Sequence, residues 1–295
     1  MADGDALIAY LNGEYLPRGE ARVPITDRGL LFGDSVYEVV PAYGGRPFRV
    51  EHHLQRLDRS LASIRMDNPL SHAEWRHIFE RLSQQLPGQD QSIYLQVTRG
   101  AYPVRKHVIP AQIHPNVLAF TSPNPPRDPE KAERGIRVIT LDDIRWHRCD
   151  IKATALLANV LARAQATEEG ADEAILIRDG AALEGTASNL FVVSNGLLIT
   201  PPDSEELLPG ITRDLVLELA QEAGVPYAQA RIAATDLENA DEVWLTSSTR
   251  EIAAVIELNG RPVGGGRPGK LWYQMDALFQ ACKERLRQGV ECHDD

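Results

Sequence analysis

The sequence is poor in cysteine, in net positive charge and in long apolar runs, and each deficit excludes a class of protein. Its three cysteines, Cys149, Cys282 and Cys292, are widely spaced and form no CxxC pair, so they predict neither a disulfide framework nor a zinc site. Lys and Arg number 31 against 42 Asp and Glu, and this net charge of −11 opposes nonspecific binding to nucleic acid or to an anionic membrane surface. We expect the partners to be small molecules or copies of the same chain.

Membrane, export and metal-binding signals are also missing. No apolar run reaches membrane-spanning length, and the acidic segment 1–10 lacks the basic and apolar parts of a signal peptide. The eight histidines show no spacing typical of metal ligands, so no metal site is predicted. These absences predict a cytoplasmic protein.

The chain has the composition of a globular protein large enough for two domains. Hydrophobic residues make up 43% and charged residues 25% of its 295 positions. Segment 121–131 (TSPNPPRDPEK) contains four prolines and predicts an interdomain linker. We therefore expect a small α/β domain at 1–120 and a larger domain at 132–295.

Hydrophobic periodicity predicts a mixture of strands and helices in both domains. The predicted strands are 6–10, 36–43, 46–50, 93–98, 116–121, 136–141, 173–177, 190–193 and 242–246, and the predicted helices are 54–64, 75–86, 153–168, 212–223 and 270–286. This order lacks the regular βαβ rhythm of a doubly wound sheet. The fold class is therefore α/β of the α+β type, and the second domain is a mixed barrel or sandwich with helices around it.

Lys152, in RCDIKATALLANVLA, lies where an extended approach gives way to the predicted helix 153–168. A helix N-terminus disfavours positive charge, and the apolar neighbours Ile151 and Ala153 indicate partial burial. A desolvated lysine loses its proton more readily, as an amine nucleophile must. Taken alone, an ordinary surface lysine is the commoner interpretation.

Glu184 lies in LEGTASNLF, just before a predicted strand, and the small residues after it indicate a tight turn. A buried glutamate needs a cationic partner, and a protonated pyridinium nitrogen is a partner of that kind. The alternative is a turn carboxylate in water.

Two segments are candidates for binding an anion such as phosphate. LPGITRD opens a predicted helix, where the free N–H groups of Ile211 and Thr212 suit an anion, although Thr212 could instead cap the helix. Ser247 and Ser248, in the run TSST, either complete a phosphate site or form a hydroxyl-rich turn.

A short basic run, Arg105-Lys106-His107, follows the predicted strand 93–98 in this acidic protein. Arginine has the best shape for gripping a carboxylate through two parallel hydrogen bonds. A solvated basic loop is the alternative interpretation.

The order of these motifs is more specific than any one of them. Together they resemble the fold-type IV pyridoxal-phosphate-dependent aminotransferases, most closely those acting on D-amino acids. The matching motifs, spread from about Leu11 to Gly260, are GDSVYEVV, HLQRL, RKH, RCDIKATALLANVLA, LEGTASNLF, LPGITRD and LTSSTREI.

The resemblance implies pyridoxal 5′-phosphate as cofactor and assigns roles to residues that bind it. Lys152 matches the lysine that binds the cofactor covalently and moves the substrate proton, and Glu184 matches the carboxylate that keeps the ring nitrogen protonated. The remaining cofactor-binding positions are Arg56, Ile211, Thr212, Ser247 and Ser248 at the phosphate and Leu208 against the ring.

The resemblance also implies how the substrate carboxylate is bound. Tyr37, Arg105 and His107 match a carboxylate trap in which the arginine and histidine come from the other subunit. This implies a homodimer with composite active sites.

The activity implied is ping-pong transamination between D-amino acids and 2-oxo acids, for example D-alanine with 2-oxoglutarate to give pyruvate and D-glutamate. Alternatives within the same fold are a branched-chain L-amino-acid aminotransferase, an (R)-amine transaminase and a lyase resembling aminodeoxychorismate lyase. A cofactor-binding protein without catalysis is a further alternative. Glu38-Val39-Val40 after Tyr37 and the RxH loop favour the enzymes that act on D-amino acids.

Overall fold

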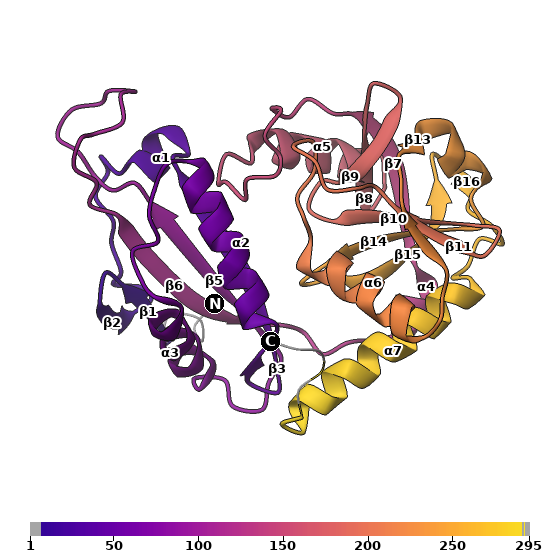
Figure 1. Cartoon of the computed structure of the whole chain (residues 1–295), viewed down its shortest axis with the longest axis horizontal. Coiled ribbons are helices and arrows are strands. Elements are labelled where there is room, and N and C mark those ends of the chain that lie inside the picture. The colour runs from indigo at the N-terminus through magenta and orange to yellow at the C-terminus, as the bar shows by residue number, and fades with distance from the viewer. Residues whose placement is uncertain (1–6, 291, 293–295) are drawn as a thin grey trace. The chain divides into compact units, whose positions relative to one another are not determined.

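The computed structural model describes residues 7–290 and residue 292, and the chain divides into two compact units (Figure 1). Unit 1 contains the described residues of Met1–Pro125, Ile151–Ala155 and Lys283–Asp295, and unit 2 contains Pro126–Asp150 and Leu156–Cys282. The short segment Ile151–Ala155, which includes Lys152, therefore clusters with the N-terminal part of the chain.

Unit 1 is built on an antiparallel sheet with strand order β2-β1-β6-β5-β3-β4. Its strands are β1 (Ile8–Leu11), β2 (Glu14–Pro17), β3 (Ser35–Tyr43), β4 (Arg46–Pro47), β5 (Gln91–Thr98) and β6 (Asn116–Pro123), and its helices are α1 (Arg28–Phe32), α2 (Val50–Ser63) and α3 (His72–Ser83). The long strands β3, β5 and β6 pair over most of their length and form the centre of the sheet.

Helices α2 and α3 cover one face of this sheet (Figure 1). Leu54, Leu57 and Leu61 repeat at helical spacing along α2 and are fully buried against the sheet. Trp75 and Phe79 do the same for α3, which starts with a capping box between Ser71 and Glu74. These apolar stripes fix which face of each helix is inside.

Unit 2 is a mixed sheet wrapped into a barrel, with helices beside it. Its strands are β7 (Ile136–Asp142), β8 (Glu173–Arg178), β9 (Ala181–Gly185), β10 (Asn189–Ser194), β11 (Leu197–Thr200), β12 (Tyr227–Gln229), β13 (Ile232–Ala233), β14 (Glu242–Ser247), β15 (Glu251–Leu258) and β16 (Arg261–Pro262). The helices that begin in this unit are α4 (Pro129–Arg134), α5 (Leu157–Glu168), α6 (Ile211–Glu222), the 3-10 helix η1 (Ala234–Asn239) and α7 (Lys270–Arg287).

The barrel closes because β9 pairs with β10 as well as with β8. The path β10-β14-β15-β7-β8-β9 returns to β10 through one residue pair, Asn189 with Glu184. The β15–β7 and β7–β8 pairs are parallel, and the other pairs on this path are antiparallel. This closed mixed sheet confirms the predicted fold class and selects the barrel over the sandwich.

The predicted helix 153–168 begins four residues later than expected, at Leu157. The segment before it is held by β3 instead, because Tyr37 N–H donates to the Lys152 carbonyl at 3.0 Å and Thr154 N–H donates to the Ser35 carbonyl at 3.1 Å. Long-range hydrogen bonds thus override local helix propensity at this point.

The cysteines correct a second expectation, because Cys282 and Cys292 are disulfide-bonded. Cys149 is a free, buried thiol. Within residues 7–290 and 292, no helix combines the length and hydropathy needed to cross a bilayer.

Candidate active site

The residues predicted to bind cofactor and substrate divide between the two units. Unit 1 contains Tyr37, Arg56, Arg105, His107 and Lys152, and unit 2 contains Glu184, Leu208, Ile211, Thr212, Ser247 and Ser248. Each group is described in its own unit.

Lys152 is half-buried in unit 1 and does not lie in a helix. Its amide N–H donates to Ser60 Oγ at 3.2 Å, and its Nζ lies 4.4 Å from the centre of the Tyr37 ring. The backbone of Lys152 is therefore held on both sides, by β3 and by α2, while its amine lies over an aromatic face. The helix-terminus argument for this lysine was wrong, since α5 begins only at Leu157.

Arg56 is buried on α2 and forms a two-pronged ion pair with Glu38 on β3. Arg56 Nε donates to Glu38 Oε1 at 2.7 Å, and Arg56 Nη2 donates to Oε2 at 2.8 Å. His53 Nδ1 lies 2.8 Å from the same Oε2. This fixes the plane of the Arg56 guanidinium.

The protonation states of this cluster follow from burial and charge. Burial alone would raise the pKa of Glu38, but Arg56 and His53 outweigh it and hold that pKa well below its usual range. Burial, only partly offset by Glu38, lowers the pKa of His53 to about 4. At neutral pH His53 is therefore uncharged, and its Nδ1–H donates to Glu38.

Sequence reasoning missed Glu38 as a structural partner and assigned no role to His53. A signal was available, because Glu38 lies between Val36 and Val40 at strand spacing and so faces the core with them.

Arg105 and His107 lie on an exposed loop between β5 and β6. Both contact the same ring, that of Phe32 in α1. The Arg105 guanidinium carbon is 4.8 Å from the ring centre, and the His107 ring centre is 5.0 Å from it. The structure therefore brings the two basic side chains of the predicted carboxylate trap together.

Glu184 is buried on β9 in unit 2, where three groups bind its carboxylate. Arg145 Nη1 donates to Oε1 at 2.5 Å, while the Leu208 N–H and Asn189 Nδ2 donate to Oε2 at 3.1 and 3.3 Å. Leu208 is thus tied to Glu184 through its backbone. The need for a cationic partner was predicted correctly, but Arg145 was missed as one.

Charge compensation around Glu184 extends further into unit 2. Asp143 accepts hydrogen bonds from Arg145 at 2.9 Å and pairs with Arg178 at 2.8 Å, so the four charges cancel. Burial raises the pKa of Glu184, and Arg145 opposes that shift. Arg145 thus only partly offsets the cost of burying this carboxylate, and a second cation beside it would favour the ionised form further.

The N-terminus of α6 begins at Ile211, directly after Gly210, and no side chain caps it in the described residues. Thr212 is a buried residue inside the helix, so the interpretation of Thr212 as the cap was wrong. A Cβ on Gly210 would come within 1.7 Å of Asn189 Oδ1, so only glycine fits here. The first N–H groups of α6 are left for an anion.

The end of β14 supplies hydroxyl groups. Ser247 Oγ accepts the Arg250 N–H at 3.1 Å, and Ser248 is half-buried beside it. Among the described residues, the buried Oγ1 of Thr246 and Oγ of Ser188 have no hydrogen-bond partner. Buried hydroxyls without partners are costly in a protein alone and indicate that a polar group belongs beside them.

Three of the residues described for unit 2, Glu184, Asn189 and Thr246, lie in one row across the barrel. Glu184 pairs with Asn189, and Asn189 pairs with Thr246, across β9, β10 and β14. A carboxylate can accept a hydrogen bond from a protonated ring nitrogen, and the N–H groups of a helix N-terminus and hydroxyls without partners can donate to a phosphate, so this arrangement suits pyridoxal phosphate. The residues of unit 2 therefore fit this cofactor.

Comparison with known proteins identifies the family. Residues 35–258 match the model of the class IV amino-transferases. A D-alanine aminotransferase of Bacillus licheniformis is 43% identical over 270 residues, covering 91% of this chain and 94% of that protein. A D-alanine aminotransferase of Listeria monocytogenes is 38% identical over 280 residues, covering 93% and 97%. The chain belongs to the class IV aminotransferases.

Solved structures agree with this assignment. A T.th. branched-chain amino acid aminotransferase with pyridoxamine 5′-phosphate has a TM-score of 0.89 at 26% identity, covering 96% of this chain and 97% of that one. The Escherichia coli branched-chain enzyme has a TM-score of 0.86 at 28% identity, covering 94% of each chain. The protein is thus a transaminase of fold type IV, and enzymes of this family use pyridoxal 5′-phosphate.

Proposed function

We propose that the protein transfers amino groups between D-amino acids and 2-oxo acids, with D-alanine and 2-oxoglutarate as the first pair to test. The observation that carries this proposal is the 43% identity to a D-alanine aminotransferase over 91% of the chain. The pairing of Arg105 with His107 on one aromatic ring supports it, because two adjacent donors suit a substrate carboxylate.

Lys152 would bind the cofactor covalently, and Glu184 would pair with its ring nitrogen. Ile211, Thr212, Ser247, Ser248 and Arg56 would hold its phosphate, and Leu208 would pack against its ring. When bound, pyridoxal phosphate accepts the electron pair left at the substrate Cα, which no side chain here can do.

The chain's own residues supply proton transfer and orientation. The amine of Lys152 removes the proton from the substrate Cα and returns it in the reverse direction. Tyr37, Arg105 and His107 bind the substrate carboxylate, and this binding decides which enantiomer turns its Cα–H bond toward Lys152. One amino acid leaves as a 2-oxo acid before the second 2-oxo acid binds, so the kinetics are ping-pong.

We further propose that the protein is a cytoplasmic homodimer. Each unit exposes large apolar side chains that a single chain leaves in water. In unit 2, Leu157, Val160 and Leu161 share one face of α5 and are 71%, 59% and 53% exposed. In unit 1, Ile25 is 82% and Val108 is 76% exposed. Such surfaces are typical of faces covered by a second subunit.

A branched-chain L-amino-acid aminotransferase is the competing function, favoured by the similar folds of the two branched-chain enzymes. The visible absorption of the cofactor-loaded protein separates the two. We expect excess D-alanine to remove the absorption of the lysine-bound cofactor, and L-alanine and L-leucine to leave it. Loss of absorption with L-leucine alone would favour the branched-chain L-amino-acid aminotransferase instead. Loss with none of the three amino acids would show that the protein transaminates none of them.

A further inference from the structure

Helix α1 is a single five-residue turn that contacts the basic loop through both of its end residues, Arg28 and Phe32. These positions are four apart and therefore share one helix face. The Phe32 ring lies 4.9 Å from the Arg28 guanidinium carbon and 4.8 Å from that of Arg105. With the His107 ring 5.0 Å away, one aromatic side chain contacts three potential cations.

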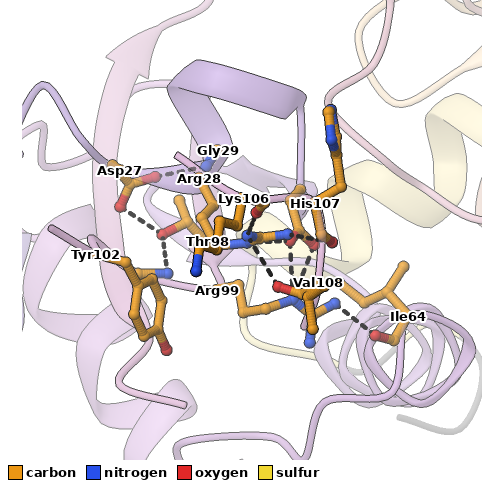
Figure 2. A network of polar contacts seen from close by, with 12 residues as sticks. Asp27, Arg28, Gly29, Ile64, Thr98, Arg99, Tyr102, Lys106, His107 and Val108 are labelled. Carbon is orange, nitrogen blue, oxygen red and sulfur yellow. Dashed lines mark hydrogen bonds and ion pairs between the residues drawn. The ribbon is translucent and has the colours of Figure 1, made fainter. Parts of the chain in front are cut away.

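Arg28 holds the main chain of the loop (Figure 2). Its Nη1 donates to the carbonyl of Lys106 at 2.6 Å and to that of Val108 at 3.4 Å, and its Nη2 donates to that of His107 at 3.4 Å. One guanidinium thus binds three consecutive carbonyls. This fixes the backbone on both sides of His107.

The side chain of Arg28 is itself held in place by two other buried or partly buried charged residues of unit 1. Its Nε donates to Asp34 at 2.7 Å, and Asp34 also accepts two hydrogen bonds from Arg99 Nε at 2.9 and 3.0 Å. Arg99 Nη2 continues to the Ile64 carbonyl, at the end of α2, at 2.6 Å (Figure 2). Arg28 and Arg99 are only 6% and 2% exposed.

The charges of this chain of contacts are stable. Burial would raise the pKa of Asp34, but hydrogen bonds and charge from Arg99 and Arg28 outweigh it and lower that pKa. Asp34 therefore stays ionised, and together with the two arginines it gives one net positive charge close to the loop. All three kinds of nitrogen on Arg28 are engaged by the protein, so its role is to hold the loop and not to bind substrate.

We infer that Arg28 and Phe32 are positioning residues that hold Arg105 and His107 in the geometry needed to bind the substrate carboxylate. This inference rests on the proposed function of the loop. An exposed loop with free side chains would lose conformational entropy on binding substrate. The contacts from α1 remove that entropy cost before substrate binds. The Phe32 ring orients the side chains of Arg105 and His107, and Arg28 fixes the main chain of the loop.

The test compares Phe32→Leu and Arg28→Lys with the natural protein in steady-state transamination of D-alanine. Leucine keeps an apolar side chain without a ring, and lysine keeps the charge without the planar fork. We expect KM for D-alanine to rise about fivefold or more in each variant, because each variant loses a contact that orders the binding loop. The value of kcat should change less than about twofold. Phe32→Tyr keeps the ring and should restore KM.

The matched control is Arg134→Lys, at a position on α4 with 72% of its side chain exposed, which should leave both constants unchanged. The second measurement combines Phe32→Leu with Arg105→Leu. Because Phe32 would act partly through Arg105, the double variant should lose less than the sum of the two single losses.

Unchanged KM in both Phe32→Leu and Arg28→Lys would overturn the inference, as would fully additive losses in the double variant. Thermal unfolding of every variant identifies a loss caused by misfolding, and Phe32→Tyr then decides the question. Failure of the proposed function itself would give a different result. In that case the Arg105→Leu variant would show unaltered D-alanine kinetics.

Discussion

Glu184 has a protein cation on one oxygen and neutral donors on the other. Arg145 binds Oε1, while the Leu208 N–H and Asn189 bind Oε2 more weakly. Because burial raises the pKa of Glu184, the ionised form depends on Arg145. If Glu184 pairs with the ring nitrogen of the cofactor as proposed, Arg145 controls how much negative charge is available to that nitrogen.

Replacing Arg145 with glutamine should weaken binding of pyridoxal phosphate in a pH-dependent way. Without the arginine the pKa of Glu184 rises further, so a larger fraction is protonated near neutral pH and cannot pair with the ring nitrogen. We expect about a tenfold or greater loss of affinity at pH 7, and this loss should shrink as the pH is raised from 7 to 9 because the ionised fraction of Glu184 rises with pH.

The measurement is the dissociation constant of the cofactor across this pH range. Arg261→Gln is the control, since Arg261 is 79% exposed in its ion pair. A loss of equal size at every pH would contradict the role assigned to Arg145.

At the scale of elements, the sequence was most informative where packing repeats along the chain. The stripe Leu54, Leu57, Leu61 predicted α2, and α7 was predicted within a residue of its observed end. The start of α5 was wrong because hydrogen bonds to β3, distant in sequence, hold the segment before it. Arg145 was missed for the same reason, as no local pattern connects it to Glu184, 39 residues away.

Gly210 directly precedes α6, whose N-terminus we propose to bind the cofactor phosphate. In Gly210→Ala the new Cβ overlaps Asn189, which must move and give up its 2.7 Å hydrogen bond to the Leu208 carbonyl. We expect the free energy of unfolding to fall by about 1–3 kcal/mol, as in other overpacked sites. Affinity for pyridoxal phosphate should fall with it.

Urea unfolding with and without cofactor measures both effects. Gly265→Ala is a suitable control, because the nearest atoms to its new Cβ are 3.8 Å away. Equal stability of the two variants would show that Asn189 adapts without cost.

At the scale of the whole molecule, the proposed dimer makes a prediction about hybrid subunits. Lys152→Ala removes the proposed proton carrier, and Arg105→Leu removes part of the proposed carboxylate trap. If Arg105 serves the site of the other subunit, a dimer of one variant chain with the other contains one site with both residues intact.

Co-expression of the two variants should therefore restore activity to about a quarter of the natural level, since random pairing makes half of the dimers mixed and each mixed dimer has one complete site. Each variant alone serves as its own control, and Lys152→Ala alone should be inactive. Failure of the mixture to exceed the Arg105→Leu preparation would mean that the loop serves its own subunit.

The barrel of unit 2 closes through the pair of Glu184 with Asn189, and Glu184 is also the residue that we propose to pair with the ring nitrogen of the cofactor. The closure of the barrel and the proposed cofactor site therefore share Glu184. A ligand that binds Glu184 would stabilise the single residue pair that closes the barrel. Its binding energy would therefore oppose local opening of the sheet at that pair. Loss of the cofactor then weakens the fold as well as the chemistry, and turnover of the protein in the cell becomes linked to the supply of its cofactor.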